Sequence, residues 1–259
     1  MPHKQPGSPD HRPIIGITAD VHTDSTGIGW FRSRFEYADA VSRAGGVPVL
    51  LAPPPSDDLV DAHARACAAM VDAVVFSGGA DINTESLAGP GRAPLHPKAS
   101  AMDARRQAFD LALFRALDGE DARHKPVLGI CLGMQEMAAH RGARLIQHMH
   151  DTLGDGAEAH RRDNHHAVAP SIGDHPVIRV AARVASSHHQ AVDLPAGSPL
   201  RVVARGHDGV IEAVDDPARP FYLGVQWHPE RTRRDEGAGD ALSDGLFRAL
   251  VEHARAQRR

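Results

Sequence analysis

The chain has 259 residues, 42% of them hydrophobic, which is enough for a sizeable buried core and excludes a disordered, collagen-like or disulfide-scaffold protein. Its 29 Lys and Arg against 33 Asp and Glu leave a net charge of −4, so no general attraction to nucleic acid or to an anionic membrane is expected. Only two cysteines, no long apolar stretch and an N-terminus without a secretory signal predict a soluble, cytoplasmic protein.

Extended and helical patterns alternate through the first half of the chain. Runs of β-branched and other apolar residues predict strands at residues 13–19, 47–53, 73–76 and 127–130. Apolar residues at helical spacing predict helices at residues 31–44, 59–70, 102–117 and 132–142. This alternation is typical of a single α/β domain with a mostly parallel central sheet flanked by helices, which binds ligands beyond the carboxyl ends of its strands.

The second half has shorter elements. Strands are expected at residues 144–147, 177–181, 200–204, 210–214 and 222–226, and a final helix at about 241–256. The Pro/Gly-rich stretch 88–98 and the His-rich stretch 148–166 are interpreted as surface loops near the strand ends. Residues 13–257 are therefore predicted to form one domain after a flexible N-terminal segment, residues 1–12.

The strongest local feature is Cys131, the centre of a Gly-x-Cys-x-Gly sequence between a predicted strand and a predicted helix. Gly129 and Gly133 lack the Cβ atoms that a sharp strand-to-helix turn cannot accommodate, and the helix N-terminus favours a thiolate. This pattern predicts a nucleophile elbow. Cys67, in contrast, lies within a helical run and is interpreted as a buried structural cysteine.

A thiol nucleophile needs an imidazole to shuttle its proton, and the imidazole needs a third group to orient it. His228 and Glu230 fit this requirement in the sequence GVQWHPE, because side chains two residues apart on an extended chain project to the same side. The alternative is a surface histidine beside an acidic residue; the elbow cysteine favours the catalytic interpretation.

The segments PVLGICLGMQ and GVQWHPE resemble the nucleophile and His/Glu motifs of class I, or triad-type, glutamine amidotransferases. Within that superfamily SGGADIN, DARRQAFD, SSHHQAV and HDGVIEAV resemble γ-glutamyl hydrolases, above all the γ-glutamyl-γ-aminobutyrate hydrolase (peptidase C26) family of polyamine breakdown. The likeness covers nearly the whole chain. It implies a flavodoxin-like α/β fold of the class I glutamine amidotransferase type.

The resemblance implies a role for each matching residue. Cys131 is expected to be the nucleophile, His228 the general base and acid, and Glu230 its orienter. The backbone amides of Gly79 and Leu132 are expected to form the oxyanion hole. Residues that match substrate-binding positions, or border the substrate cleft, are Gly78, Gln135, Ser186, His188 and Gln190.

Three positions depart from the family pattern. Leu132 follows the nucleophile where the hydrolase branch has Arg, Thr84 replaces a Pro, and Ala185 replaces an Asn. Leu132 is the choice of the amidotransferases proper. Because the departures lie around the cleft and not in the catalytic motifs, they bear on the substrate and not on the type of reaction.

The paired residues among the 18 histidines also suggest a metal site. Adjacent histidines on an extended strand point to opposite faces, so neither His165 with His166 nor His188 with His189 is expected to hold one ion. No metal and no cofactor are predicted. A further set matches family positions but equally fits ordinary caps and ion pairs: Asp81, Asp103 and Arg106.

We therefore expect a cysteine hydrolase that cleaves a small-molecule γ-glutamyl amide through a γ-glutamyl thioester. One alternative is a glutaminase subunit that delivers ammonia to a separate synthase, and another is a non-catalytic γ-glutamyl binding protein. No nucleic acid or membrane partner is expected, and a homodimer stays open. Basic residues of the two surface loops are expected to recognise the leaving group: Arg92, Lys98, Arg161 and Arg162.

Overall fold

A nine-stranded sheet forms the centre of the protein in the computed structural model, which describes residues 12–231 and 238–257. From one edge to the other its strands are β4 (Val47–Leu51), β1 (Ile14–Thr18), β5 (Ala73–Phe76), β6 (Val127–Ile130), β13 (Tyr222–Val225), β12 (Ile211–Asp215), β11 (Arg201–Gly206), β8 (Asn164–Pro170) and β9 (Ala182–Ser186). All of these strands run in the same direction except β12 and β8. The predicted mostly parallel α/β sheet is confirmed.

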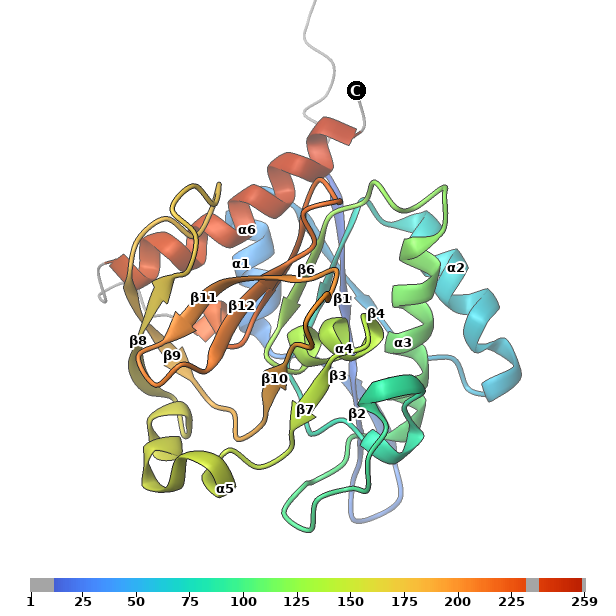
Figure 1. Ribbon diagram of the computed structural model, residues 1–259. Coiled ribbons are helices and arrows are strands. Elements are labelled where there is room, and N and C mark those ends of the chain that lie inside the picture. Colours follow the sequence, from blue (N-terminus) through green and yellow to red (C-terminus); the bar gives the residue numbers. More distant parts are fainter. Residues whose placement is uncertain (1–11, 232–237, 258–259) are drawn as a thin grey trace, which may run out of the picture.

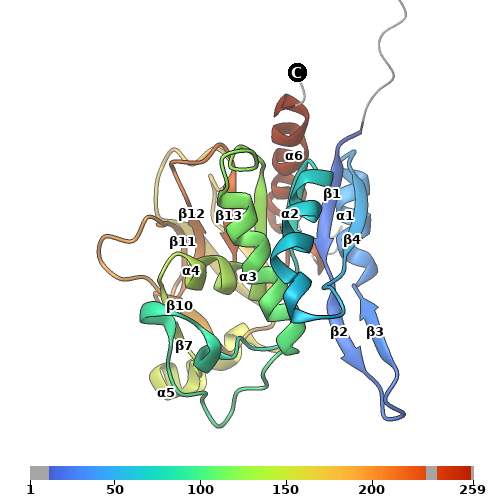
Figure 2. The same ribbon diagram turned by 90° about the vertical axis from the view of Figure 1, so that its right-hand side faces the viewer.

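Helices cover both faces of this sheet, as Figures 1 and 2 show. On one face lie α1 (Phe35–Arg43) and α6 (Ala238–Gln257); on the other lie α2 (Val60–Met70), α3 (Ala104–Asp118) and α4 (Leu132–His140). Side chains alternate between the two cores along each strand. In β5, Val75 packs in the core that contains Leu246 of α6, whereas Val74 packs in the core that contains Phe109 of α3.

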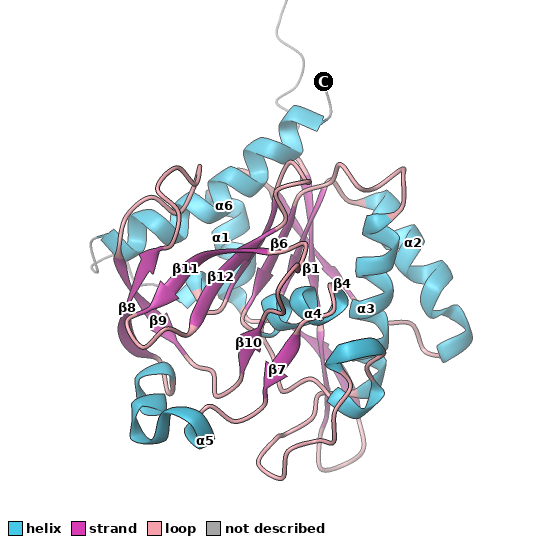
Figure 3. Ribbon diagram, viewed as in Figure 1, coloured by secondary structure: helices cyan, strands magenta, loops and turns pink. Residues whose placement is uncertain are grey.

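Smaller elements surround the sheet (Figure 3). Two of them pair separately: β7 (Arg144–Ile146) with β10 (Ala191–Asp193), and β2 (Asp20–Thr23) with β3 (Gly29–Arg32). The His-rich stretch contains the short helix α5 (His150–Leu153) and the 3-10 helix η4 (Gly154–His160). No helix in the described ranges is both long and apolar enough to span a bilayer.

The β2–β3 hairpin corrects the helix expected at residues 31–44, which begins only at Phe35. Its turn is closed by Asp24, whose Oδ1 accepts hydrogen bonds from the backbone amides of Thr26 (2.8 Å) and Ile28 (3.0 Å). Gly27 supplies the left-handed conformation, with φ +86°. Because β3 is exposed along its whole length, its sequence carries no alternation of apolar and polar residues.

The strand expected at residues 177–181 is also wrong; β8 and β9 lie on either side of it. β8 begins inside the stretch that was interpreted as a loop. The strand was missed because His166 takes an inward position that a strand usually gives to an apolar residue. The histidines thus conceal the alternation that marks a strand. The segment predicted to be flexible, residues 1–12, lies outside the described residues apart from Arg12.

Candidate active site

The candidate site lies at the edge of the sheet where the parallel strands end. The carboxyl end of β5 leads into Ser77, Gly78 and Gly79, that of β6 into Cys131, and that of β13 toward His228. Because β5, β6 and β13 are neighbours in the sheet, these three segments converge although they are far apart in the sequence. This is the edge at which open α/β sheets bind their ligands.

Cys131 occupies a strained turn between β6 and α4. Its φ of 53° and ψ of −104° are rare for a residue with a side chain. The two flanking glycines make the turn possible: a Cβ at Gly129 would lie 2.7 Å from the backbone of Gly133, and a Cβ at Gly133 would overlap the carbonyl oxygen of Phe76. This is the geometry that the Gly-x-Cys-x-Gly pattern predicts, and it raises the thiol above the end of the strand.

Cys131, His228 and Glu230 form a chain of hydrogen-bonded side chains. A hydrogen bond joins Cys131 to the His228 ring, and His228 Nδ1 donates to Glu230 Oε1 over 2.8 Å. All three residues are buried. The backbone amide of His228 also donates to the carbonyl of Ala185 (2.9 Å), which fixes the position of the segment against β9.

The charges of this chain favour a protonated imidazole. Burial acts to lower the pKa of His228, but the charge of Glu230 and the interactions with Cys131 outweigh it and raise the pKa to about 9. Burial acts to raise the pKa of Glu230, but His228 and then Arg231 more than offset it, so this pKa lies below its usual value. An imidazolium held between a carboxylate and a thiol is the arrangement of a cysteine nucleophile with its acid–base partner.

Tyr37 of α1 supports the loop after β5. The backbone amide of Gly78 donates to the Tyr37 hydroxyl over 2.8 Å. Burial, with the charges of Glu230 and Cys131, raises the pKa of Tyr37 well above its ordinary value, so the hydroxyl keeps its proton. The Gly78 amide is thus engaged, whereas no acceptor for the Gly79 amide is found in the part of the chain that the structure describes.

Arg106 of α3 also supports the loop after β5. Its guanidinium is fully buried and donates to the carbonyl oxygens of Ser77 (2.9 Å) and Gly78 (3.2 Å). Its charge is balanced by Asp110 at 3.3 Å and Asp20 at 3.2 Å. Arg106 therefore shapes the loop through its backbone.

Two other residues left open by the sequence have structural contacts. Asp103 caps the N-terminus of α3 by accepting a hydrogen bond from the Arg105 amide (2.9 Å). Asp81 pairs with His189 at 2.9 Å and accepts from the Ser100 amide at 2.7 Å.

A cavity of about 650 Å³ opens beside His228; Cys131 and Glu230 do not line it. Gly78, Gly79 and His228 contribute to its wall, together with Ser187. Three arginines also line it: Arg32, Arg34 and Arg231. These arginines were not among the predicted site residues; Arg32 and Arg34 fall within residues 31–44, which were predicted as helix.

The other predicted substrate-binding residues lie behind this wall. Gln135, Ser186, His188 and Gln190 are at most 4% exposed, and none of them lines the cavity. Gln135 Nε2 donates to Gln226 Oε1 over 3.3 Å. Their role in substrate binding stays a prediction.

The two surface loops do not form the rim of this cavity, contrary to expectation. Lys98 and Arg161 instead line a different cavity of about 800 Å³, where the two loops meet. The basic residues next to the catalytic chain therefore come from the hairpin region and from the segment after His228.

Residues that could hold a metal ion form two groups in the described ranges. One is exposed and contains His148, His150 and Asp151; the other is buried and contains His160, His166, His188 and Glu212.

Three neighbouring strands of the sheet end in a Gly-Gly pair, in an elbow cysteine and in a His/Glu segment. The fold is that of the class I glutamine amidotransferases, and solved structures of that class superimpose on it. A glutamine amidotransferase from Thermotoga maritima superimposes with a TM-score of 0.57 at 15% identity, over 94% of this chain and 98% of that one. The acivicin-bound glutaminase domain of CTPS from Trypanosoma brucei gives 0.56 at 14% identity, over 94% of each chain. At such identities the likeness establishes the fold.

The chain belongs to the peptidase C26 family, which it matches over residues 13–230. It is 36% identical to "Putative glutamine amidotransferase Rv2859c" of Mycobacterium tuberculosis, over 94% of this chain and 75% of the relative. It is 28% identical to a γ-glutamyl-γ-aminobutyrate hydrolase of Escherichia coli O157:H7, over 86% of this chain and 88% of the relative. The resemblance in the sequence motifs is confirmed, and the protein is a hydrolase of the glutamine amidotransferase-like kind.

Proposed function

We propose that the protein hydrolyses γ-glutamyl amides through a γ-glutamyl thioester on Cys131, with His228 as general base and acid and Glu230 as its orienter. The observation that carries the proposal is the hydrogen-bonded chain of these three side chains, with Cys131 held in a strained elbow and its partner His228 lining an open cavity. Family membership supports the same reaction type.

The reaction proceeds in two halves. The Cys131 thiolate attacks the γ-carbonyl carbon, and the backbone amides of Gly79 and Leu132 stabilise the oxyanion. Collapse of this intermediate breaks the C–N bond, and the amine leaves with the proton of the His228 imidazolium. Neutral His228 then takes a proton from water, whose hydroxide attacks the thioester; glutamate is released and the thiolate returns.

We propose that the leaving amine carries a carboxylate, as γ-aminobutyrate does. The support is the set of three arginines that line the cavity, because guanidinium groups bind carboxylates with two parallel hydrogen bonds. Arg34 is the best candidate, since its contact with Glu36 is long (3.5 Å) and exposed, whereas Arg32 pairs with Asp20 at 3.0 Å. An activity of this kind fits the polyamine breakdown that the resemblance implies.

A second candidate is a glutaminase subunit that delivers ammonia to a separate synthase. Leu132, which follows the nucleophile as in the amidotransferases proper, favours it, and so does the amidotransferase name of the mycobacterial relative. Such a subunit gains from staying inactive until its partner binds, because free ammonia is wasted.

The two candidate functions predict different kcat/KM values for γ-glutamyl-γ-aminobutyrate and for glutamine. For γ-glutamyl hydrolysis we expect the purified chain alone to cleave γ-glutamyl-γ-aminobutyrate faster than glutamine, and Cys131→Ser to remove both activities. Activity on glutamine alone, arising only after addition of cell extract, would reverse the ranking.

The leaving-group proposal has its own test. Arg34→Gln should lower kcat/KM about tenfold for γ-glutamyl-γ-aminobutyrate, the effect of losing one partly exposed charge-assisted contact. It should change little for γ-glutamylethanolamine, which has no carboxylate on its amine. Arg43→Gln, at the far end of α1, is the matched control. An equal loss on both conjugates would contradict carboxylate recognition.

A further inference from the structure

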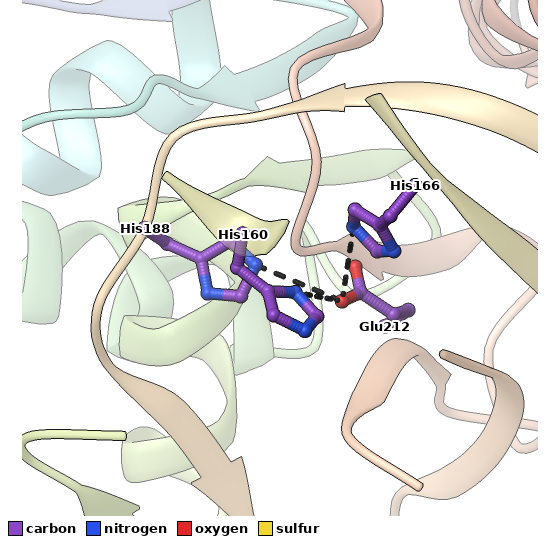
Figure 4. A group of neighbouring side chains, drawn as sticks. All are labelled: His160, His166, His188 and Glu212. Atoms are coloured by element: carbon purple, nitrogen blue, oxygen red, sulfur yellow. Dashed lines mark ion pairs between the residues drawn. The ribbon is translucent and has the colours of Figure 1, made fainter. Parts of the chain in front are cut away.

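One histidine of each adjacent pair turns into the interior and meets a buried carboxylate. Figure 4 shows the three imidazole rings around one oxygen of the glutamate. The four residues come from η4, β8, the segment between β9 and β10, and β12, and all are at most 4% exposed. We call this group the histidine–glutamate cluster: His160, His166, His188 and Glu212.

The spacing of its donor atoms fits a small cation. Glu212 Oε1 lies 3.1 Å from His160 Nδ1, 3.5 Å from His166 Nε2 and 3.6 Å from His188 Nε2. All four donor atoms are within 4.8 Å of one another. Bonds of about 2.0–2.2 Å in a tetrahedral zinc site separate neighbouring ligand atoms by about 3.3–3.6 Å.

The nitrogens on the outer side of the rings all face hydrogen-bond acceptors, so each must carry a proton. A carboxylate or carbonyl bonded to the outer nitrogen is the usual support of a metal-binding histidine. The contacts are His160 Nε2 to Asp208 Oδ2 (2.6 Å), His188 Nδ1 to the Gln190 carbonyl (2.9 Å) and His166 Nδ1 to the Ala167 carbonyl (3.3 Å).

Each inner nitrogen therefore carries a lone pair when its ring is neutral, and this lone pair faces the Glu212 carboxylate. For His166 the Ser186 hydroxyl, at 2.7 Å, can donate to this nitrogen. Apart from the ion pairs that join them to one another, His160 Nδ1, His188 Nε2 and both oxygens of Glu212 have no hydrogen bond of good geometry in the described part of the chain. Buried acceptor atoms without a hydrogen-bond donor are costly, and one shared cation satisfies them together.

Protons on the rings are the alternative to an ion, and one proton on His160 would serve only the pair of that ring with Glu212. Protonating all the rings would place three positive charges in the interior, with the ring centroids of His166 and His188 only 4.3 Å and 4.9 Å from that of His160. Like charges so close and so poorly hydrated destabilise each other. A divalent ion instead uses every inner lone pair at once.

We propose that the histidine–glutamate cluster binds a divalent transition metal ion, and that this ion is zinc. Imidazole and carboxylate ligands in a tetrahedral arrangement suit zinc, and four protein ligands in a closed, buried position are typical of a structural site. The ion joins η4 and the segment after β9 to the central sheet. That segment contains Ser187, which lines the catalytic cavity, so the ion holds one wall of the active site.

No metal was predicted from the sequence, because adjacent histidines face opposite sides of a strand. In the structure these two residues lie between β9 and β10, where His188 turns inward and His189 pairs with Asp81. That expectation concerned two adjacent histidines on one ion, whereas in the proposed site each pair supplies a single ligand and the remaining ligands come from elsewhere in the chain.

The test is the metal content of the untagged protein, purified without a polyhistidine tag from zinc-containing medium and measured by plasma mass spectrometry. We expect about one zinc ion per chain in the wild type and less than about 0.1 in Glu212→Gln and in His188→Gln. His150→Gln is the matched control, because it removes a ligand from the exposed group and should keep the ion.

A second measurement does not depend on whether the variants fold. Removing the ion from the wild type with a chelator should lower Tm, and zinc at a hundredfold excess over its dissociation constant should raise it again by about 5–10 °C. Calcium and magnesium, which prefer oxygen ligands, should not replace it. Cobalt should give the intense visible absorption of tetrahedral coordination, which Glu212→Gln should lack.

Three results would overturn the inference. The first is a wild-type protein without stoichiometric metal whose Tm does not respond to zinc. The second is zinc retained in both Glu212→Gln and His188→Gln. The third is zinc lost in His150→Gln, which would assign the ion to the exposed group.

Discussion

The proton on His228 offers the sharpest test of the catalytic chain. A rise in its pKa from 6.5 to about 9 corresponds to about 3 kcal/mol in favour of the imidazolium, at about 1.4 kcal/mol for each pKa unit. The largest contribution in this direction is the charge of Glu230, whose Oε1 lies 2.8 Å from Nδ1. Glu230→Gln removes this charge and leaves the shape of the side chain.

The sign of the effect follows from which form reacts. The imidazolium protonates the departing amine, so kcat/KM of the wild type should fall as the pH rises through about 9. In Glu230→Gln only Cys131 still opposes the effect of burial, so the fall should move to a lower pH. A shift of the His228 pKa from about 9 to its ordinary 6.5 would lower the protonated fraction at pH 8, and with it kcat/KM, by about 30-fold.

The free energy of unfolding should likewise fall as the pH rises. Because the folded-state pKa of His228 lies above its unfolded value, the stabilisation is complete below about pH 6.5 and is lost as the pH rises through about 9. Thermal unfolding of the wild type and Glu230→Gln at pH 6 and pH 10 measures it, and the difference between them should shrink at pH 10.

The assay is the pH profile of kcat/KM on the best γ-glutamyl conjugate, with the His228 ring followed by NMR. Glu252→Gln, an exposed change of the same kind on α6, serves as the control. An alkaline limb that stays near pH 9 in Glu230→Gln would refute the electrostatic role assigned to this carboxylate.

The remaining predictions concern the nucleophile, the base and the elbow. Iodoacetamide should inactivate the protein by labelling Cys131 and not Cys67, which is buried with its pKa raised by that burial; peptide mass mapping decides, and inactivation traced to Cys67 would contradict the assignment. His228→Ala should lower kcat by about 10²- to 10⁴-fold with Tm little changed, so wild-type turnover would require a different base. Gly133→Ala should lower Tm by about 3–10 °C, because its Cβ overlaps the backbone of β5, whereas Gly173→Ala, with open space around it, should change Tm little.

Patterns that act over a few residues were predictable from the sequence. The strands at residues 73–76 and 127–130 have the predicted bounds, because continuous apolar runs bounded by turn residues mark buried parallel strands. The elbow at Cys131 was predictable because its geometry depends on glycines two residues away on either side. The His228–Glu230 contact was predictable for the same reason, since only one residue separates the two.

Elements exposed on both sides, or lined with polar residues, were not predictable in this way. The β2–β3 hairpin carries no alternation, so the arginines that it brings to the cavity were missed. β8 was hidden because histidine, which counts as polar in a sequence pattern, fills one of its inward positions.

What the sequence by itself determined was the α/β fold and the identity of the candidate catalytic residues, because neighbours along the chain set both. Only the tertiary structure decided what surrounds them. The register of β8 against β9 places His166 opposite Val184, and the order of the strands brings β12 within reach of both His166 and His188. Such convergence depends on contacts between residues 18 or more positions apart, and no local periodicity records it.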